Sequence, residues 1–140
     1  MSLVKLALDW TPNTNHTGFF VARHKGFYQD LGVEVEIIDP QSDNFIITPA
    51  KKLMNGQIDF AINPSESIIS LHTKKNPIDA VAVATLLKED VSAIVSLTSS
   101  GIQRPRDLDG KVYASYGARY EDKIVKEMVI NDGGKGDVKF

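Results

Sequence analysis

The sequence predicts an α/β protein with a parallel-rich sheet flanked by helices. Short apolar segments of strand length alternate with segments of helical periodicity along the first half of the 140-residue chain. Parallel strands require crossover connections, and a helix between successive strands provides them. Proline follows Thr48 and again follows Asn63, a pattern typical of helix starts. Together these observations favour parallel strands joined by helices.

The first half of the chain is expected to contain three strands and three helices. Strands are predicted at residues 4–8, 33–38 and 58–62, where apolar residues run together or alternate with acidic ones. Helices are predicted at 16–25, where Gly26 ends the pattern, at 49–54 after Thr48, and after the cap-and-proline pair Asn63-Pro64.

The second half of the chain changes in character. Two apolar strands, at residues 78–87 and 93–98, are expected to leave the first unit and enter another. This predicts a first α/β lobe at 1–87, then a crossover and a partial second lobe at 88–140. A helical turn at 105–108, a strand at 112–117 and an amphipathic helix from about residue 120 should follow, with another strand beginning at 137.

Composition excludes several classes of function. The net charge is −2 and the isoelectric point is near 5.9, so we expect no nucleic-acid partner. The absence of cysteine excludes disulfides, thiolate metal sites and cysteine nucleophiles. His16 and His24 would lie about 12 Å apart along a helix, too far to share a metal, so no metal site is predicted. "GGKGD" at 133–137 lacks the phosphate-loop pattern and is expected to be a helix-ending turn.

The chain shows no signal peptide and no apolar run of the roughly 18 residues that a membrane helix requires. We expect a periplasmic or cell-surface location if a signal has been removed, and a cytoplasmic one otherwise.

Three strand-to-helix loops carry most of the candidate functional groups. They are "LDWTPNTNHTGFF" at 8–20, "NPSES" at 63–67 and "YGARYE" at 116–121. Ligands of open parallel sheets bind beyond the carboxyl ends of the strands, so these loops are expected to converge on one cleft. Each helix start also offers unpaired backbone N–H groups to a ligand.

Each candidate residue also has a purely structural interpretation. Trp10 could close an edge of the core, and His16 could cap or pack its helix. Ser65 and Glu66 suit a helix start on capping and dipole grounds alone, and Tyr116 could be an ordinary half-buried aromatic residue. From the residues alone these alternatives remain open.

The same segments carry a family resemblance. "LDWTPNTNHTGFFVARHKGFYQDLGVEVEI", "TPAKKLMNGQIDFAINPSESII" and "LTSSGIQRPRDLDGKVYASYG" resemble the periplasmic-binding-protein-like proteins that bind or make the pyrimidine precursor of thiamine. The similarity covers nearly the whole chain. It implies the type II binding-protein fold, in which two α/β lobes joined by crossing strands hold the ligand between them.

The resemblance implies a ligand site for an aminopyrimidine. Trp10 would stack on the flat pyrimidine ring, and polar side chains would hydrogen-bond its amino group and nitrogens. With the loop residue Tyr116, the expected ligand-binding residues are Trp10, Asn15, His16, Asn63, Ser65, Glu66, Tyr116 and Glu121.

The family that the chain resembles contains importer subunits and a fungal-type synthase. The synthase consumes its own lysine and histidine, with pyridoxal phosphate and iron involved, and these positions correspond here to Asn63 and Ser67. Asparagine forms no Schiff base and serine has no imidazole. We therefore expect a binding protein without catalytic residues or cofactors, with an ABC-type permease as a possible partner. The alternatives are a synthase-like enzyme and a binder of another solute such as a sulfonate; Trp10 argues against an anion site.

Proteins of the family that the chain resembles are longer than 140 residues. A second lobe that is incomplete at Phe140 is expected to expose a sheet edge and the apolar helix face around Ile124 and Met128. We therefore expect either a fragment of a longer protein or a chain that finds its missing strands in another copy. For the second case we expect a homodimer or higher assembly in which the 90–140 segments pair.

Overall fold

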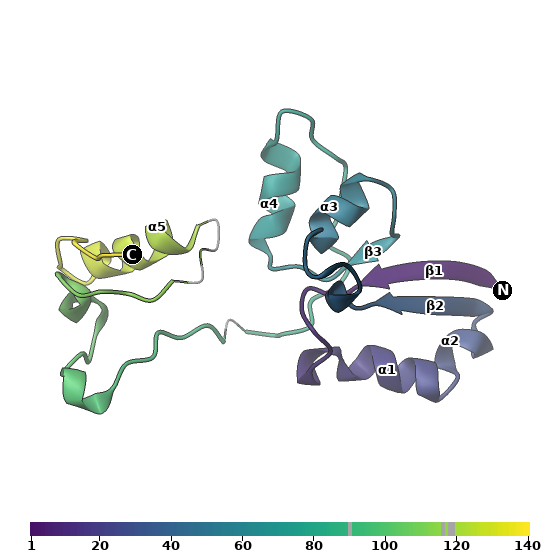
Figure 1. Cartoon of the computed structure of the whole chain (residues 1–140), viewed down its shortest axis with the longest axis horizontal. Helices are drawn as coiled ribbons and strands as arrows, with labels where there is room; N and C mark the ends of the chain where they lie inside the picture. The colour runs from purple at the N-terminus through teal and green to yellow at the C-terminus, as the bar shows by residue number, and fades with distance from the viewer. Residues whose placement is uncertain (90, 116, 118–119) are drawn as a thin grey trace. The chain divides into compact units, whose positions relative to one another are not determined.

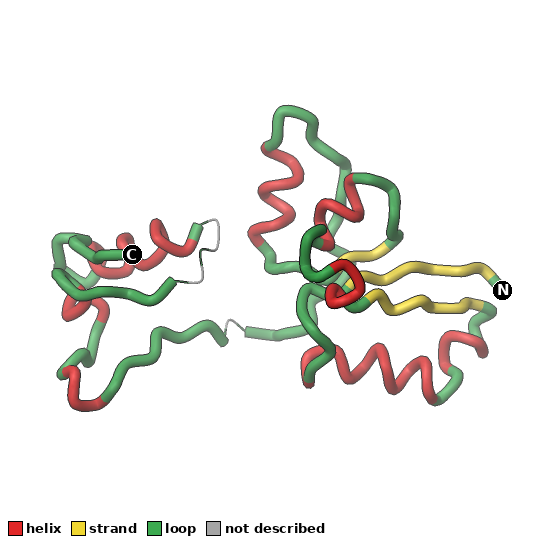
Figure 2. Tube along the Cα trace, in the orientation of Figure 1, coloured by secondary structure: helices red, strands yellow, loops and turns green. Residues whose placement is uncertain are grey.

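The computed structural model describes residues 1–89, 91–115, 117 and 120–140. The chain forms two compact units, Met1–Glu89 and Asp90–Phe140. All the strands of the sheet belong to the first unit, as the yellow segments of Figure 2 show.

The first unit contains a three-stranded parallel sheet. Its strands are β1 (Ser2–Ala7), β2 (Val33–Ile38) and β3 (Phe60–Ala61), in the order β2-β1-β3. In the register, Ala7 at the end of β1 lies opposite Ile38 on one side and Ala61 on the other. The prediction of an α/β chain with a parallel sheet flanked by helices is confirmed (Figure 1).

The burial of the strands follows their sequence pattern. Val33, Val35 and Ile37 are half-buried on β2, whereas Glu34 and Glu36 are exposed. This alternation places the three apolar side chains on one covered face. The central strand β1 contributes Leu6 and Ala7 to the core, and Leu8 follows them at 1% exposure.

Two of the predicted helices form where the sequence places them. A 3₁₀ turn, η1 (Thr14–His16), leads into α1 (Thr17–His24), and Gly26 takes the left-handed φ of 78° after it. Helix α2 (Phe27–Asp30) follows and contacts β2. Helix α3 (Pro49–Met54) contacts β3, and the backbone N–H of Lys51 donates to Thr48 Oγ1 at 3.3 Å, which confirms the predicted cap.

The third helix, α4 (Glu66–Thr73), begins later than the sequence predicts. Residues 64–67 form a turn in which the N–H of Ser67 donates to the carbonyl of Pro64. Ser65, directly before the helix, already has helical angles and makes no side-chain cap. The prediction that Asn63 caps this helix is therefore wrong, because Pro64 lies in the preceding turn and not in the first helical position.

The strands predicted at 78–87 and 93–98 are absent from the described residues, which run there as irregular chain (Figure 2). Val81, Val83 and Val95 are 71%, 70% and 90% exposed. A strand requires a neighbour to pair its backbone, and high β-propensity alone does not supply one. The start of this segment is held to α4 by His72, whose Nε2 donates to the carbonyl of Ala80 at 2.7 Å.

The second unit is organised around α5 (Glu121–Asn131). Buried Val125 and Val129 of this helix pack with Leu108 and Val138. Leu108 ends the 3₁₀ turn η4 (Pro105–Leu108), which appears where the sequence predicts it, and η3 (Thr98–Ser100) lies earlier in the unit. Of the strands predicted at 112–117 and from 137, the described residues form one parallel bridge between Val112 and Lys139, and residue 116 lies outside them.

The glycine-rich segment after α5 is a helix-ending turn, as predicted. The N–H of Gly134 donates to the carbonyl of Val129 and that of Gly133 to Ile130, the bond pair of a Schellman motif. The Asp109 carboxylate then accepts the N–H groups of Lys135 at 2.6 Å and Asp137 at 2.8 Å. These bonds give the segment a structural role. No helix among the described residues combines the length and apolar character needed to cross a membrane.

Candidate functional site

Three loops of the first unit begin side by side at the carboxyl edge of the sheet. Pairing continues just past the strands, because the N–H of Leu8 donates to Ile38 and the N–H of Ile62 donates to Ala7. Residues 9–13, 39–48 and 63–65 therefore leave neighbouring strands that lie about 4.8 Å apart. Figure 1 shows these loops at the arrowhead ends of β1 and β2. Sequence reasoning selected the first and third loops but missed the second.

Trp10 stands exposed at this edge. Its side chain is 61% exposed, which excludes the interpretation that it closes the core. The ring of Phe45, from the loop after β2, lies against it with the centroids 5.2 Å apart and the planes tilted by 45°. Phe45 is itself 43% exposed. The edge of the sheet thus presents two adjoining aromatic rings to solvent.

His16 braces the loop that carries Trp10. It is 1% exposed, and its Nδ1 accepts the backbone N–H of Asn13 at 3.3 Å. Its proton therefore resides on Nε2, which donates to Asp9 Oδ1 at 2.8 Å. Since both ring nitrogens are engaged, the geometry favours the packing and capping role of His16.

The asparagines of the same loop complete this bracing. Asn13 Oδ1 accepts the N–H of Asn15 at 2.9 Å, and Asn13 Nδ2 donates to the carbonyl of Thr11 at 3.0 Å. The side chain of Asn15 is exposed, on a short stretch whose backbone is already ordered. A preordered loop loses little conformational freedom when it binds a ligand.

The loop after β2 is held at its start and again at its middle. Asp39 Oδ1 accepts the N–H of Gln41 at 2.9 Å, which starts the 3₁₀ turn η2 (Pro40–Asp43). Asp43 Oδ2 pairs with the ammonium group of Lys52 on α3 at 2.8 Å, and Lys52 is only 8% exposed. The hydrogen bond from Lys52 lowers the pKa of the Asp43 carboxyl below its ordinary value. The ion pair fastens this loop to α3.

The loop after β3 carries three predicted site residues. Asn63 follows Ile62 and is half-buried, Ser65 is exposed, and Glu66 is half-buried in the first turn of α4. The positive end of the helix favours the Glu66 carboxylate, whether or not a ligand binds. The structural interpretation of Ser65 and Glu66 therefore remains open.

The last two predicted residues belong to the second unit. Tyr116 lies outside the described residues. Glu121 begins α5, where Tyr113 Oη donates to its Oε1 at 2.9 Å and Ser115 Oγ donates to its Oε2 at 2.6 Å. These bonds tie the helix start to residues 113–115. That this loop joins the other two at one cleft stays a prediction.

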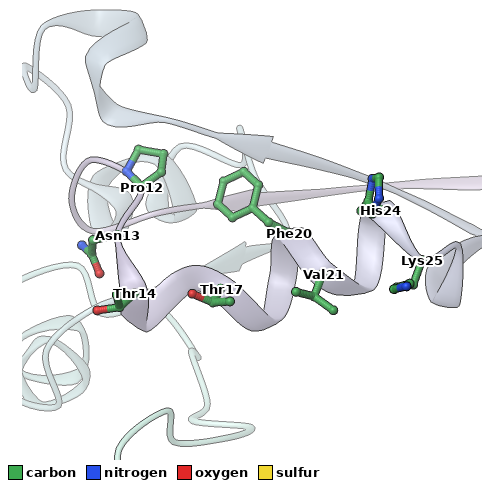
Figure 3. Close-up of a pocket in the computed structure, with 8 residues that line it drawn as sticks. All are labelled: Pro12, Asn13, Thr14, Thr17, Phe20, Val21, His24 and Lys25. Atoms are coloured by element: carbon green, nitrogen blue, oxygen red, sulfur yellow. The ribbon is translucent and has the colours of Figure 1, made fainter.

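A shallow groove of about 540 Å³ lies along α1, apart from the two rings. Figure 3 shows Pro12 and Asn13 at one end, Phe20 and Val21 along the helix, and Lys25 at the other end. None of the predicted site residues lines it. Among the described residues, no three His, Asp or Glu side chains gather as a metal-binding group.

Residues 13–140 match the protein family described as NMT1/THI5 like. The chain belongs to this family. The resemblance found in the sequence is confirmed, and the match includes the loops after β2 and β3 and the whole second unit.

Curated proteins similar to this NMT1/THI5-like chain include binding proteins and enzymes. A formylaminopyrimidine-binding protein of Halalkalibacterium halodurans is 28% identical over 96% of this chain and 39% of its own length. A putative thiamine biosynthesis protein of Haemophilus influenzae is 27% identical over 93% of this chain and 40% of its own length. A 4-amino-5-hydroxymethyl-2-methylpyrimidine phosphate synthase of Legionella pneumophila is 30% identical over 91% of this chain and 38% of its own length. The chain thus spans about two fifths of the length of these relatives.

Proposed function

We propose that this protein binds an aminopyrimidine precursor of thiamine and does not convert it. The observation that carries the proposal is the exposed ring of Trp10 at the carboxyl edge of the parallel sheet. A tryptophan face stacks well on a flat heteroaromatic ring, and such stacking contributes roughly 1–3 kcal/mol per base in nucleic-acid complexes. The relative named as a formylaminopyrimidine-binding protein supports this class of ligand.

Hydrogen-bonding groups near the ring would fix the orientation of the pyrimidine. Asn63 leaves β3, the strand next to the one that carries Trp10, and offers both a carbonyl and an amide group. Glu66 follows in the first turn of α4 and would accept from the exocyclic amino group. We propose that Asn15, Ser65, Tyr116 and Glu121 complete the set, while His16 acts by holding the Trp10 loop.

The residues at two positions support the proposal of binding without catalysis. Schiff-base chemistry with pyridoxal phosphate needs an amine, and Asn63 has only an amide. Ser67 likewise has no imidazole where the synthase is expected to have its histidine. The residues present therefore do not fit pyridoxal phosphate at this loop, although relatives named as synthases occur among the similar proteins.

The proposed binding protein has the periplasmic-binding-protein-like type II fold, of which residues 1–87 form the first lobe. The parallel sheet with its loops at one edge supports this assignment. Its partner would be the permease of an ABC-type importer. We propose a periplasmic or cell-surface location if a signal has been removed, and a cytoplasmic one otherwise.

Titration of the 140-residue chain with 4-amino-5-hydroxymethyl-2-methylpyrimidine, thiamine and taurine tests the proposal. Trp10 is the only tryptophan, so its fluorescence reports on the site directly. We expect saturable quenching by the aminopyrimidine, with ligand and protein recovered unchanged in mass after incubation with pyridoxal phosphate and Fe²⁺. Quenching by taurine alone would show that the ligand is a sulfonate. A protein that loses mass while pyrimidine forms would identify a synthase.

A further inference from the structure

The loop after β2 contains an unusual backbone. Among the residues that the structure describes, Asn44 and Phe45 are the only non-glycine residues with positive φ, at 54° and 60°. Asparagine tolerates this left-handed region because its short polar side chain can bond locally, but phenylalanine gains no such compensation. Two such residues in succession therefore place strain at Phe45 that a glycine would relieve.

Burial explains only part of why phenylalanine occupies this position. A strained core residue can be stabilised by the apolar area that it buries, yet 43% of Phe45 remains exposed. Its ring instead lies against Trp10, which is even more exposed. The strain thus holds an aromatic ring at the surface, beside the residue on which the proposed ligand site is centred.

The surroundings hold this backbone in place. The N–H of Phe45 donates to the carbonyl of Pro40 at 3.0 Å, and that of Ile46 donates to Asp43 at 3.1 Å. The ion pair between Asp43 and the nearly buried Lys52 secures the same turn to α3. A strained conformation persists when several such contacts determine it together.

We propose that Phe45 is a specificity-determining residue that forms the second aromatic wall of the ligand site. The inference rests on the proposed function for the identity of the ligand. A planar ring stacked on Trp10 would lie tilted by 45° to the ring of Phe45, because the two side-chain planes make that angle. Stacked and edge-to-face contacts are the arrangements that aromatic rings prefer. The pair thus selects a flat ring over a compact anion.

Substitutions at Phe45 distinguish the contribution of its aromatic ring to ligand affinity from the effect of its backbone strain on stability. The variants are Phe45→Ala, Phe45→Gly and Phe45→Tyr in the 140-residue chain. The matched control is Phe27→Ala, on α2 beside the amino ends of the strands, where the ring is 55% exposed (Figure 1). Calorimetry measures affinity for 4-amino-5-hydroxymethyl-2-methylpyrimidine, thiamine and adenine, and thermal denaturation measures stability.

The aromatic ring of Phe45 should determine the affinity for the ligand, and the positive φ at this position should determine the stability of the variants. We expect Phe45→Ala and Phe45→Gly to weaken binding by about two- to tenfold and Phe27→Ala to leave it unchanged. Phe45→Tyr keeps an aromatic ring and should weaken binding less than Phe45→Ala. Phe45→Gly should melt at a higher temperature than Phe45→Ala. Glycine is ordinarily the less stable of the two, so this reversed order would identify the strain.

Each result has a definite consequence. Unchanged affinity in Phe45→Ala and Phe45→Gly overturns the inference and leaves the proposed function intact. A Phe45→Gly variant that melts below Phe45→Ala overturns the claim of strain. If the wild-type protein binds adenine but no thiamine precursor, the proposed function fails and the same variants test Phe45 with adenine. If the wild type binds none of the planar rings, both proposals fail.

Discussion

Trp10 lies outside the core, where its proposed role in ligand binding is separate from packing. Its ring is 61% exposed, whereas Leu8, two residues earlier, is 1% exposed. Truncation of an exposed side chain removes little buried area, so its effect on folding is small. Mutation of these two positions can therefore test the proposed ligand contact apart from packing.

We expect Trp10→Ala to weaken aminopyrimidine binding by roughly 1–3 kcal/mol and to lower the free energy of unfolding by no more than about 1 kcal/mol. Leu8→Ala is the matched control for packing and should lower the free energy of unfolding by about 2–5 kcal/mol. Calorimetry gives the affinity and urea denaturation the stability. If Trp10→Ala lost as much stability as Leu8→Ala, the result would show that Trp10 packs in the core.

At the scale of elements, an ion pair and a backbone bond join the end of α5 to η4. The Arg104 guanidinium donates to both oxygens of Asp132, at 2.8 Å from Nε to Oδ2, and the N–H of Arg106 donates to Oδ2 at 3.0 Å. The hydrogen bonds from Arg104 lower the pKa of the Asp132 carboxyl to about 2. Protonation of Asp132 should therefore loosen the end of the helix.

This contact predicts a pH dependence in the second unit. Because the folded pKa is lower than the ordinary 3.8, the stabilisation is complete above about pH 4 and is lost as the pH falls towards 2. Asp132→Asn should flatten this part of the profile, measured by hydrogen exchange of α5 amides between pH 5 and pH 2. Asp122→Asn, an exposed change on the same helix, should leave the slope intact. If the Asp132→Asn profile were as steep as that of the wild type, other carboxylates would account for the loss of stability at low pH. Asp109 is one of them, because the backbone N–H of Lys135 lowers the pKa of its carboxyl.

At the scale of the whole molecule, apolar side chains remain in solvent on both units. Ile124 and Met128 on one face of α5 are 56% and 41% exposed, and Val81 and Val95 more so. Contiguous exposed apolar surface commonly marks a protein–protein contact. The exposures of Val95, Ile124 and Met128 support the proposal that the 90–140 segments of two or more copies pair.

We expect a dimer or higher assembly in sedimentation velocity at micromolar concentration. Ile124→Glu should shift it towards the monomer, since a charge buried in an apolar contact is strongly unfavourable. Glu127→Gln, also exposed on α5, should leave the assembly unchanged. A compact wild-type monomer would show that these segments do not pair.

The sequence by itself determined the family, the class of fold and the elements with strong local signals. The alternation on β2, the Thr48-Pro49 cap, Gly26 after α1 and the apolar periodicity of α5 all act within a few residues. Such signals depend on backbone geometry and on one buried face, which neighbouring residues specify. The same local character explains why the helix-ending turn at 133–137 was predicted correctly.

Only the tertiary structure decided what depends on residues far apart in the chain. The apolar segments at 78–87 and 93–98 were predicted to be strands, but a strand exists only where another chain segment pairs with its backbone. Phe45 became part of the candidate site because the parallel sheet brings the loop after β2 next to Trp10. The deciding contacts lie between residues distant in sequence, and the folded sheet is what brings them together.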